Sequence, residues 1–270
     1  MDIFNFAVYS VIRIECDNGL VGTGFFFSFL NKKVHKISAD SETPYITIVT
    51  NKHVIENGNN IKIIFSKEHY NQSWGTKSEV FKLNYPLKNH VIMHSDPDID
   101  LCAIKITNAL NYISSPNPYF EPFDAYFEPL SIKHIPDESQ LEELNYVEDV
   151  LMVGYPNGLY DEKNNLPIFR RGITATHSRV DFEGLPECLI DMYITGGSSG
   201  SPVFLNFTNT KERDRKPLFL GILKGVMIKE IMELDDSQSN RISKFQIEIN
   251  LGIVIKAKSL WDIQKQIYSL

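Results

Sequence analysis

The chain has 270 residues, of which 43% are hydrophobic and 23% are charged. This composition is that of a globular protein and excludes a largely disordered chain. Acidic residues outnumber basic ones by 34 to 27, and this net charge of −7, with no local cluster of basic residues, argues against nucleic acid as a partner. At roughly 100–200 residues per domain, the length suits one large domain or two small ones.

Three cysteines, Cys16, Cys102 and Cys188, are too few and too scattered for a disulfide framework. They form no C-x-x-C pair, which excludes a zinc ribbon and a thioredoxin-type motif. The N-terminus lacks the basic stretch and cleavage site of a signal peptide, and no apolar run reaches the roughly 18 residues of a membrane span. We therefore expect a cytoplasmic protein with reduced thiols that needs no metal ion or organic cofactor and binds no membrane.

Short segments rich in Val, Ile and Phe, each bounded by Gly, Pro, Asn or Asp, predict β-strands along most of the chain. Six are expected at residues 7–14, 22–29, 45–50, 61–65, 79–83 and 101–106. Six more follow at residues 150–154, 172–176, 188–191, 202–205, 218–226 and 245–255. Many short strands with turns between them are typical of an all-β barrel or sandwich rather than of alternating strands and helices.

Residues 113–145 interrupt this pattern. Their first half is rich in proline and aromatic residues, which excludes a central strand, and Asp137 with the acidic residues after it predicts a short helix. We interpret this segment as a connector between two β domains, the alternative being a long decorated loop of a single sandwich.

The C-terminus predicts the clearest helix of the chain. Ser259 and Asp262 fit an S-x-x-D capping box, and Leu260, Ile263 and Ile267 recur with helical spacing. This pattern indicates a helix that packs against a β-barrel.

Three fragments carry candidate chemistry. IVTNKHV ends an apolar strand in a polar turn that holds His53, DPDIDLCAIKI places Asp100 directly before a buried strand, and GGSSGSPVF surrounds Ser199 with small residues. A serine hydroxyl needs a neutral imidazole to take its proton, and the imidazole needs a carboxylate to fix its tautomer. The amides of Ser199 and Gly197 would bind the oxyanion. Because Asp96 and Asp98 lie within the same turn, they compete with Asp100 for the carboxylate role.

The chain order of these residues discriminates between classes of serine hydrolase. An α/β-hydrolase needs a histidine after the serine, but the last histidine here is His177. The subtilisin order needs an acid before the histidine, and no D-[ST]-G turn precedes His53. The order that remains, His53, Asp100 and Ser199, is that of the chymotrypsin-type double β-barrel.

The chain resembles trypsin-like serine peptidases of the chymotrypsin fold, and is closest in style to bacterial trypsin-like domains and the HtrA/Deg group. The similarity runs through GTGFFF, TNKHV, DLCAIKI, the G-x-P-x-G at residues 154–158, and GSSGSP. The resemblance implies two six-stranded antiparallel β-barrels with a C-terminal helix. It divides the chain into a first barrel at residues 1–112, a connector at 113–145, a second barrel at 146–257 and the helix at 258–270.

The resemblance also implies a substrate pocket, whose wall would include Tyr193, Thr195 and Gly196, with Tyr193 at the floor six residues before the nucleophile. Tyr193 carries no negative charge, so we expect a preference for small or apolar side chains rather than Arg or Lys. From the two later strands, both Gly221 and Gly225 fit the pocket wall.

The chain departs from the family's pattern at two positions of the nucleophile loop. Ser198 stands where members activated by cleavage carry an aspartate, so activation at the N-terminus is not expected. Ser201 replaces a glycine and offers a second hydroxyl close to Ser199. The disulfides of the family are also missing.

Other polar residues have simpler explanations. His90 and His94 are interpreted as surface residues rather than zinc ligands, Arg170 and Arg171 as a solvated strand edge or a site for a substrate carboxylate, and Cys102 as core packing.

The sequence thus predicts a serine endopeptidase acting on protein or peptide substrates. A regulatory protein partner could order the site through the connector or the loop at residues 161–166. The alternative is a catalytically silent domain of the same fold that serves as a binding scaffold.

Overall fold

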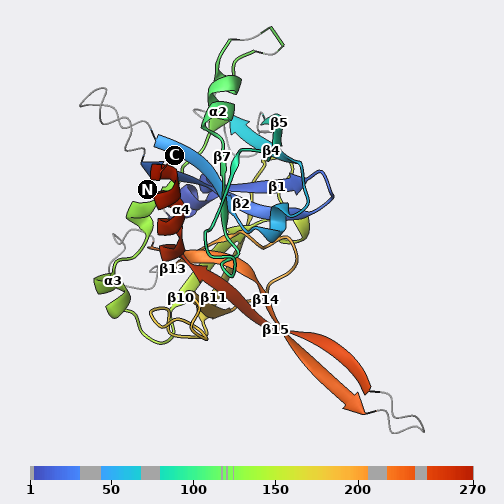
Figure 1. The fold of residues 1–270 in the computed structure, drawn as a ribbon, viewed down its shortest axis with the longest axis vertical. Coiled ribbons are helices and arrows are strands. Elements are labelled where there is room, and N and C mark those ends of the chain that lie inside the picture. The colour runs from blue at the N-terminus through green and yellow to red at the C-terminus, as the bar shows by residue number, and fades with distance from the viewer. Residues whose placement is uncertain are drawn as a thin grey trace.

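A computed structural model of the chain describes residues 3–30, 44–67, 80–116, 118–119, 121–123, 125–205, 218–234 and 242–269. Two β-structures follow one another along the chain, and a C-terminal helix lies beside them (Figure 1). The predicted all-β fold class is confirmed.

The N-terminal half is a mostly antiparallel sheet in the order β5-β4-β1-β2-β3-β7-β6. Among the described residues its two edge strands do not pair with each other, so this half is an incomplete barrel. Its strands are β1 (Val11–Cys16), β2 (Val21–Leu30), β3 (Pro44–Thr50), β4 (Asn60–Lys67), β5 (Val80–Pro86), β6 (Val91–Met93) and β7 (Cys102–Lys105).

The C-terminal half is a closed barrel in the order β10-β11-β12-β15-β14-β13. Its strands are β10 (Asp149–Gly154), β11 (Ile168–Thr174), β12 (Glu187–Asp191), β13 (Pro202–Leu205), β14 (Leu218–Leu234) and β15 (Ile242–Lys256). The last two are longer than the sequence predicts, and they continue away from the barrel as a projecting ribbon (Figure 1).

A shared apolar core joins the two halves. Phe25 and Phe27 of β2 meet Phe204 of β13 and Phe219 of β14 in one buried cluster, and the rings of Phe25 and Phe219 lie 5.3 Å apart between centroids. Aromatic side chains bury large areas and prefer such edge-on contacts, so this cluster fixes one half against the other. The apolar side chains predicted for the C-terminal helix α4 (Leu260–Ser269), namely Leu260, Ile263 and Ile267, complete the cluster, and the expectation of a docking helix is confirmed.

The prediction of a strand at residues 7–14 is wrong in its first half. Residues Ile3–Ser10 form helix α1, and β1 starts at Val11. Ala7 and Ser10, three residues apart, are both buried, as they are on one side of a helix. A short apolar run does not distinguish helix from strand by its periodicity, and here packing decides.

The predicted capping box of the C-terminal helix is also wrong. Ser259 lies in a preceding turn of 3-10 helix (Ala257–Ser259), and its buried hydroxyl has no hydrogen-bond partner in the part of the chain that the structure describes. The carboxylate of Asp262 instead accepts hydrogen bonds from the amide and hydroxyl of Ser95, at 2.9 and 2.8 Å. Asp262, predicted as part of the cap, thus connects helix α4 to the N-terminal half.

The segment interpreted as a connector contains more structure than the sequence suggests. It begins within helix α2 (Thr107–Ser114) and contains strands β8 (Ala125–Tyr126) and β9 (Leu130–Ser131), which pair with β4 and β2. The short helix expected after Asp137 is present as α3 (Glu138–Glu142), with the Asp137 side chain accepting from the Gln140 amide at 2.9 Å. No helix in the described parts of the chain is long and apolar enough to cross a membrane.

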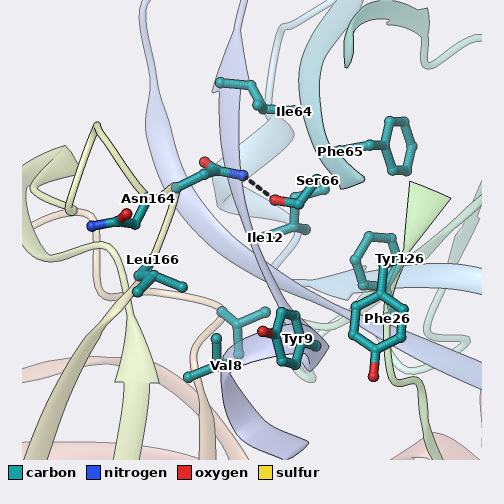
Figure 2. A pocket seen from close by; sticks show the side chains of 12 residues that line it. Val8, Tyr9, Ile12, Phe26, Ile64, Phe65, Ser66, Tyr126, Asn164 and Leu166 are labelled. Atoms are coloured by element: carbon teal, nitrogen blue, oxygen red, sulfur yellow. Dashed lines mark hydrogen bonds between the residues drawn. The ribbon is translucent and has the colours of Figure 1, made fainter. Parts of the chain in front are cut away.

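The loop at residues 161–166 lies against the N-terminal half. The side-chain amide of Asn165 donates to the hydroxyl of Ser66 in β4 at 2.8 Å, the dashed contact in Figure 2. The adjoining cavity, lined by α1, β4 and this loop, has a volume of about 30 Å³, enough for a water molecule but no larger ligand. The loop at residues 161–166, predicted as a contact site for a regulatory partner, therefore packs against the N-terminal half of the same chain.

Candidate active site

His53 stands directly after the strand that supports it. Strand β3 ends at Thr50, and His53 begins a single turn of 3-10 helix whose next two residues, Val54 and Ile55, are buried. The side chain of His53 remains 44% exposed. Asn51, fully buried, donates from its side chain to the main-chain oxygen of Asp100 at 2.8 Å, which ties the histidine turn to the segment before β7.

Asp100 contacts His53 through both carboxylate oxygens. Oδ2 lies 2.5 Å from Nδ1 of the imidazole, and Oδ1 accepts from the His53 amide at 3.1 Å. Burial by itself raises the pKa of Asp100, but the hydrogen bonds and the charge of His53 outweigh it, so this pKa lies below its usual range. An ionised carboxylate only accepts hydrogen bonds, so Nδ1 carries a proton. When the ring is neutral, Nε2 is therefore the unprotonated nitrogen that can act as a base.

The two competing carboxylates have other roles. Asp96 accepts from the Asp98 amide at 2.9 Å, and both side chains are exposed. Lys52 donates to the main-chain oxygen of Asp96 at 3.0 Å. Of the three, Asp100 is the carboxylate that the structure brings to His53.

The turn that carries Ser199 is pressed against the N-terminal half at a glycine. Gly200 has a positive φ of 86°, and a Cβ added there would lie 1.9 Å from the main-chain oxygen of Thr23 and 2.5 Å from Oγ1 of Thr50. The Thr23 amide also donates to the main-chain oxygen of Ser199 at 2.9 Å. The half-buried Ser199 therefore lies beside the end of β3, three residues before His53. The hydrogen bonds within the described residues do not include one between His53 and Ser199.

Three of the five backbone amides at residues 197–201 are hydrogen-bonded within the described residues. The amides of Ser198, Gly200 and Ser201 donate to main-chain oxygens at 3.2, 2.9 and 3.1 Å. For the amides of Gly197 and Ser199, no acceptor is found in the described part of the chain. Two unbonded amides two residues apart, at a glycine with a φ of 78°, leave donors for an anionic oxygen.

A family model described as a trypsin-like peptidase domain matches residues 22–209, more than half of the chain and all of the residues above. The chain belongs to the trypsin-like peptidase family.

One solved structure supports the fold of this family member, and two others are similar at lower TM-scores. Human heparin binding protein is 8% identical, with 96% of this chain and 91% of that chain covered and a TM-score of 0.50, which shows a chymotrypsin-like fold. An inactive serine-to-alanine mutant of Rv3671c from M. tuberculosis H37Rv is 16% identical, with coverages of 96% and 87% and a TM-score of 0.45. A serine protease of human pathogenic astrovirus is 12% identical, with coverages of 93% and 94% and a TM-score of 0.40. None of the curated proteins matches in sequence.

The residues expected to form the substrate pocket differ in their surroundings. Tyr193 is 64% exposed and lies under the guanidinium of Arg170, 5.0 Å from its ring centroid, so it does not form an enclosed pocket floor. The buried hydroxyl of Thr195 has no hydrogen-bond partner within the described ranges, and Gly196 is exposed. Gly225 faces open space, in contrast to Gly221, whose Cβ position lies 2.1 Å from a main-chain oxygen. Gly225 is therefore the glycine that can border a pocket.

The second serine of the turn is enclosed. Ser201 is fully buried, its hydroxyl has no hydrogen-bond partner among the described residues, and a Cβ on Gly154 would lie 2.0 Å from that hydroxyl. A substrate carbonyl cannot reach Ser201, which removes it as a rival of Ser199.

Thr23, which was not among the residues predicted for the site, links both halves there. The hydroxyl of Thr23 donates to the Gly197 oxygen at 3.0 Å and accepts from the Tyr155 amide at 3.0 Å. The sequence feature that could have identified Thr23 is its position between the two glycines of GTGFFF. Neighbours without side chains leave space for the Thr23 hydroxyl to contact the other half.

A hollow of about 1150 Å³ opens beside His53 on the N-terminal half, and was also not anticipated. It extends between the histidine turn, the segment between β5 and β6, and β6 itself, with Leu87, Val91 and Met93 among its apolar lining residues. A substrate held at His53 would have apolar surface to contact there.

The remaining sequence candidates are structural. His94, interpreted as a surface residue, is instead only 9% exposed and accepts from the Asp96 amide at 3.1 Å. Arg171 pairs with Asp149 at 2.7 Å across β10 and β11. Cys102 is fully buried in the core, as expected. No group of three or more His, Cys, Asp or Glu side chains suited to a metal ion occurs in the described ranges.

Proposed function

We propose that the protein is a serine endopeptidase with Ser199 as nucleophile, His53 as general base and Asp100 as the residue that orients the histidine. The observation that carries the proposal is the 2.5 Å contact between Nδ1 of His53 and Oδ2 of Asp100, at the strand end against which the Ser199 turn packs. A peptidase with this chemistry needs no metal ion, because the imidazole supplies the base and the backbone amides bind the oxyanion.

The mechanism follows from these positions. The Ser199 hydroxyl attacks the carbonyl carbon of the substrate while its proton passes to Nε2 of His53. The negative oxygen that forms is bound by the amides of Gly197 and Ser199, and the imidazolium is stabilised by Asp100. Collapse of this intermediate breaks the C–N bond, and the departing amine takes the proton from Nε2. Water then attacks the acyl-enzyme with the same base and returns the hydroxyl of Ser199.

A binding scaffold of the same fold is the second candidate, and one observation favours it. His53 and Ser199 do not share a hydrogen bond within the described residues, and a silent domain has no need of one. Catalytic hydrogen bonds are often long before substrate binds, so this observation also fits an enzyme completed by its substrate or by a regulatory partner. The three buried free thiols fit the reducing cytoplasm that we propose as its compartment.

A fluorophosphonate probe, which reacts only with an activated serine, tests the proposal. We expect labelling at Ser199, located by mass spectrometry, and loss of labelling in His53→Ala. Ser201→Ala serves as the matched control and should label as the parent does, because Ser201 is enclosed. An intact parent that takes no label, with and without peptide substrates present, would favour the scaffold.

A further inference from the structure

The ribbon formed by β14 and β15 extends well beyond the barrel (Figure 1). After the pair Val226 and Gly252, the register shifts, and the strands continue paired from Ile228 opposite Glu248 to Leu234 opposite Ile242. At about 3.4 Å per residue, this ribbon of residues 228–234 and 242–248 is roughly 20 Å long. Asn250, with a positive φ of 57°, lies where β15 leaves the ribbon for the barrel.

Both outer edges of the ribbon lack a described partner strand. Strand β14 pairs with β13 only up to Ile222, and β15 pairs with β12 only from Leu251 onward. Backbone N–H and C=O groups along a strand edge seek partners, and an isolated two-stranded hairpin is only marginally stable in water. Ile228 and Ile247 are also 53% and 47% exposed. Unpaired edges and exposed apolar side chains are the features of a strand acceptor.

The edge of β14 begins at the turn that carries Ser199. The Gly200 amide donates to the Leu223 oxygen, and the Leu223 amide donates to the Ser201 oxygen, both at 2.9 Å. From Lys224 on, this edge is free in the described residues and runs outward to Leu234. A chain added antiparallel to it would therefore run from the ribbon tip back to Ser199, with its scissile bond arriving last.

We propose that the ribbon binds the substrate as a third strand on the open edge of β14, far upstream of the scissile bond. This inference rests on the proposed function, since Ser199 must be where the bound chain ends. It assigns the substrate class: extended, unfolded polypeptide segments with ten or more residues before the cleaved bond. Folded proteins and short peptides do not reach both the ribbon and Ser199.

A ribbon truncation provides the test, with residues 228–248 replaced by Asn-Gly and the barrel pair at Val226 retained. The two probes are β-casein, an unfolded protein, and the p-nitrophenyl ester of acetyl-alanine, which is too small to reach the ribbon. We expect ester hydrolysis within about twofold of the parent and casein cleavage at least tenfold slower, mainly through KM. An equal change with both probes would overturn the proposal.

A milder variant guards against misfolding of the truncated chain. Ile228→Ser combined with Ile247→Ser should raise the KM for casein about threefold or more and leave the ester unaffected. Val180→Ser, at another exposed apolar position outside the ribbon, is the matched control and should change neither. Unaltered casein cleavage in both the double variant and the truncated variant would contradict the assignment.

Binding separates this inference from the proposed function. Fluorescent β-casein should bind Ser199→Ala at least tenfold more tightly with the ribbon than without it. If the parent hydrolyses neither probe but ribbon-dependent casein binding persists, the peptidase proposal fails and the assignment of a substrate fails with it, while polypeptide binding by the ribbon edge stands. If the parent is active and removing the ribbon changes neither casein cleavage nor casein binding, the ribbon proposal fails alone. A dimer that is lost on truncation, with casein affinity unchanged, would assign the edge to a second copy and overturn the proposal as well.

Discussion

Replacing Asp100 by asparagine exchanges one carboxylate oxygen for an NH2 group and removes the negative charge beside His53. The main-chain oxygen that accepts from Asn51 is unaffected, and the new side-chain oxygen can still accept from the His53 amide, as Oδ1 does now at 3.1 Å. The side-chain NH2 then occupies the place of Oδ2, which lies 2.5 Å from Nδ1 of His53. Because that NH2 donates, Nδ1 must accept, and the ring proton moves to Nε2.

An imidazole protonated at Nε2 cannot take the proton of Ser199, and the imidazolium also loses its negative partner. Removal of the equivalent charge in a His–Asp pair costs about 10⁴-fold in kcat. At 1.36 kcal/mol for each factor of ten, this corresponds to roughly 5.5 kcal/mol of transition-state stabilisation. We expect kcat for Asp100→Asn to fall by about this factor, with KM within a few fold and the urea midpoint little changed.

The assay is hydrolysis of acetyl-alanine p-nitrophenyl ester, with fluorophosphonate labelling in parallel. Asp98→Asn is the matched control: Asp98 is an exposed neighbouring carboxylate whose amide binds Asp96, and we expect parent activity from it. A loss in Asp98→Asn that equals the loss in Asp100→Asn, or a fully active Asp100→Asn, would refute the reasoning.

Three further outcomes concern stability and reactivity. Gly200→Ala should lose roughly 3 kcal/mol of unfolding free energy in urea titrations and most of its fluorophosphonate labelling. The new Cβ would clash with the main-chain oxygen of Thr23, and the φ of 86° is unfavourable for alanine. A stable and active variant would contradict this packing. Asp262→Asn should cost about 1 kcal/mol at pH 7, since its carboxylate accepts two hydrogen bonds from Ser95. Burial raises the pKa of Asp262, but the hydrogen bonds to its carboxylate outweigh burial, and its pKa in the folded protein is lowered. The stability that the ionised carboxylate contributes is therefore present above the ordinary carboxyl pKa and is lost as the pH falls through the lowered pKa of the folded protein. A stability difference between Asp262→Asn and the parent that persists in acid would argue against this contribution. Burial raises the pKa of Cys188 to about 12, so native protein should resist iodoacetamide at pH 8 and react only when unfolded, whereas rapid native alkylation would show an open thiol.

The fold and the site differ in how far the sequence predicts them. Much of the second barrel follows from local patterns, because β10, β12 and β13 are short apolar runs ended by turn residues, whereas the full length of β14 and β15 was not predicted. The first half was harder, since Ile3–Ser10 reads equally well as strand or helix until Ala7 and Ser10 pack. The pairing of β8 and β9 with the first sheet joins residues far apart in the chain, and no local pattern encodes it.

At the site, the candidate groups and their order along the chain can be read from the amino-acid sequence alone. His53, Asp100 and Ser199 stand at strand ends or in a glycine turn, and local composition records such positions. The choice among the three carboxylates required the folded structure, in which Asp100 contacts His53. The burial of Ser201, the exposure of Tyr193 and the packing of Gly200 against the end of β3 also follow from the fold and not from local sequence. Distances across the interface of two halves depend on how distant segments pack, and neither spacing nor composition contains that information.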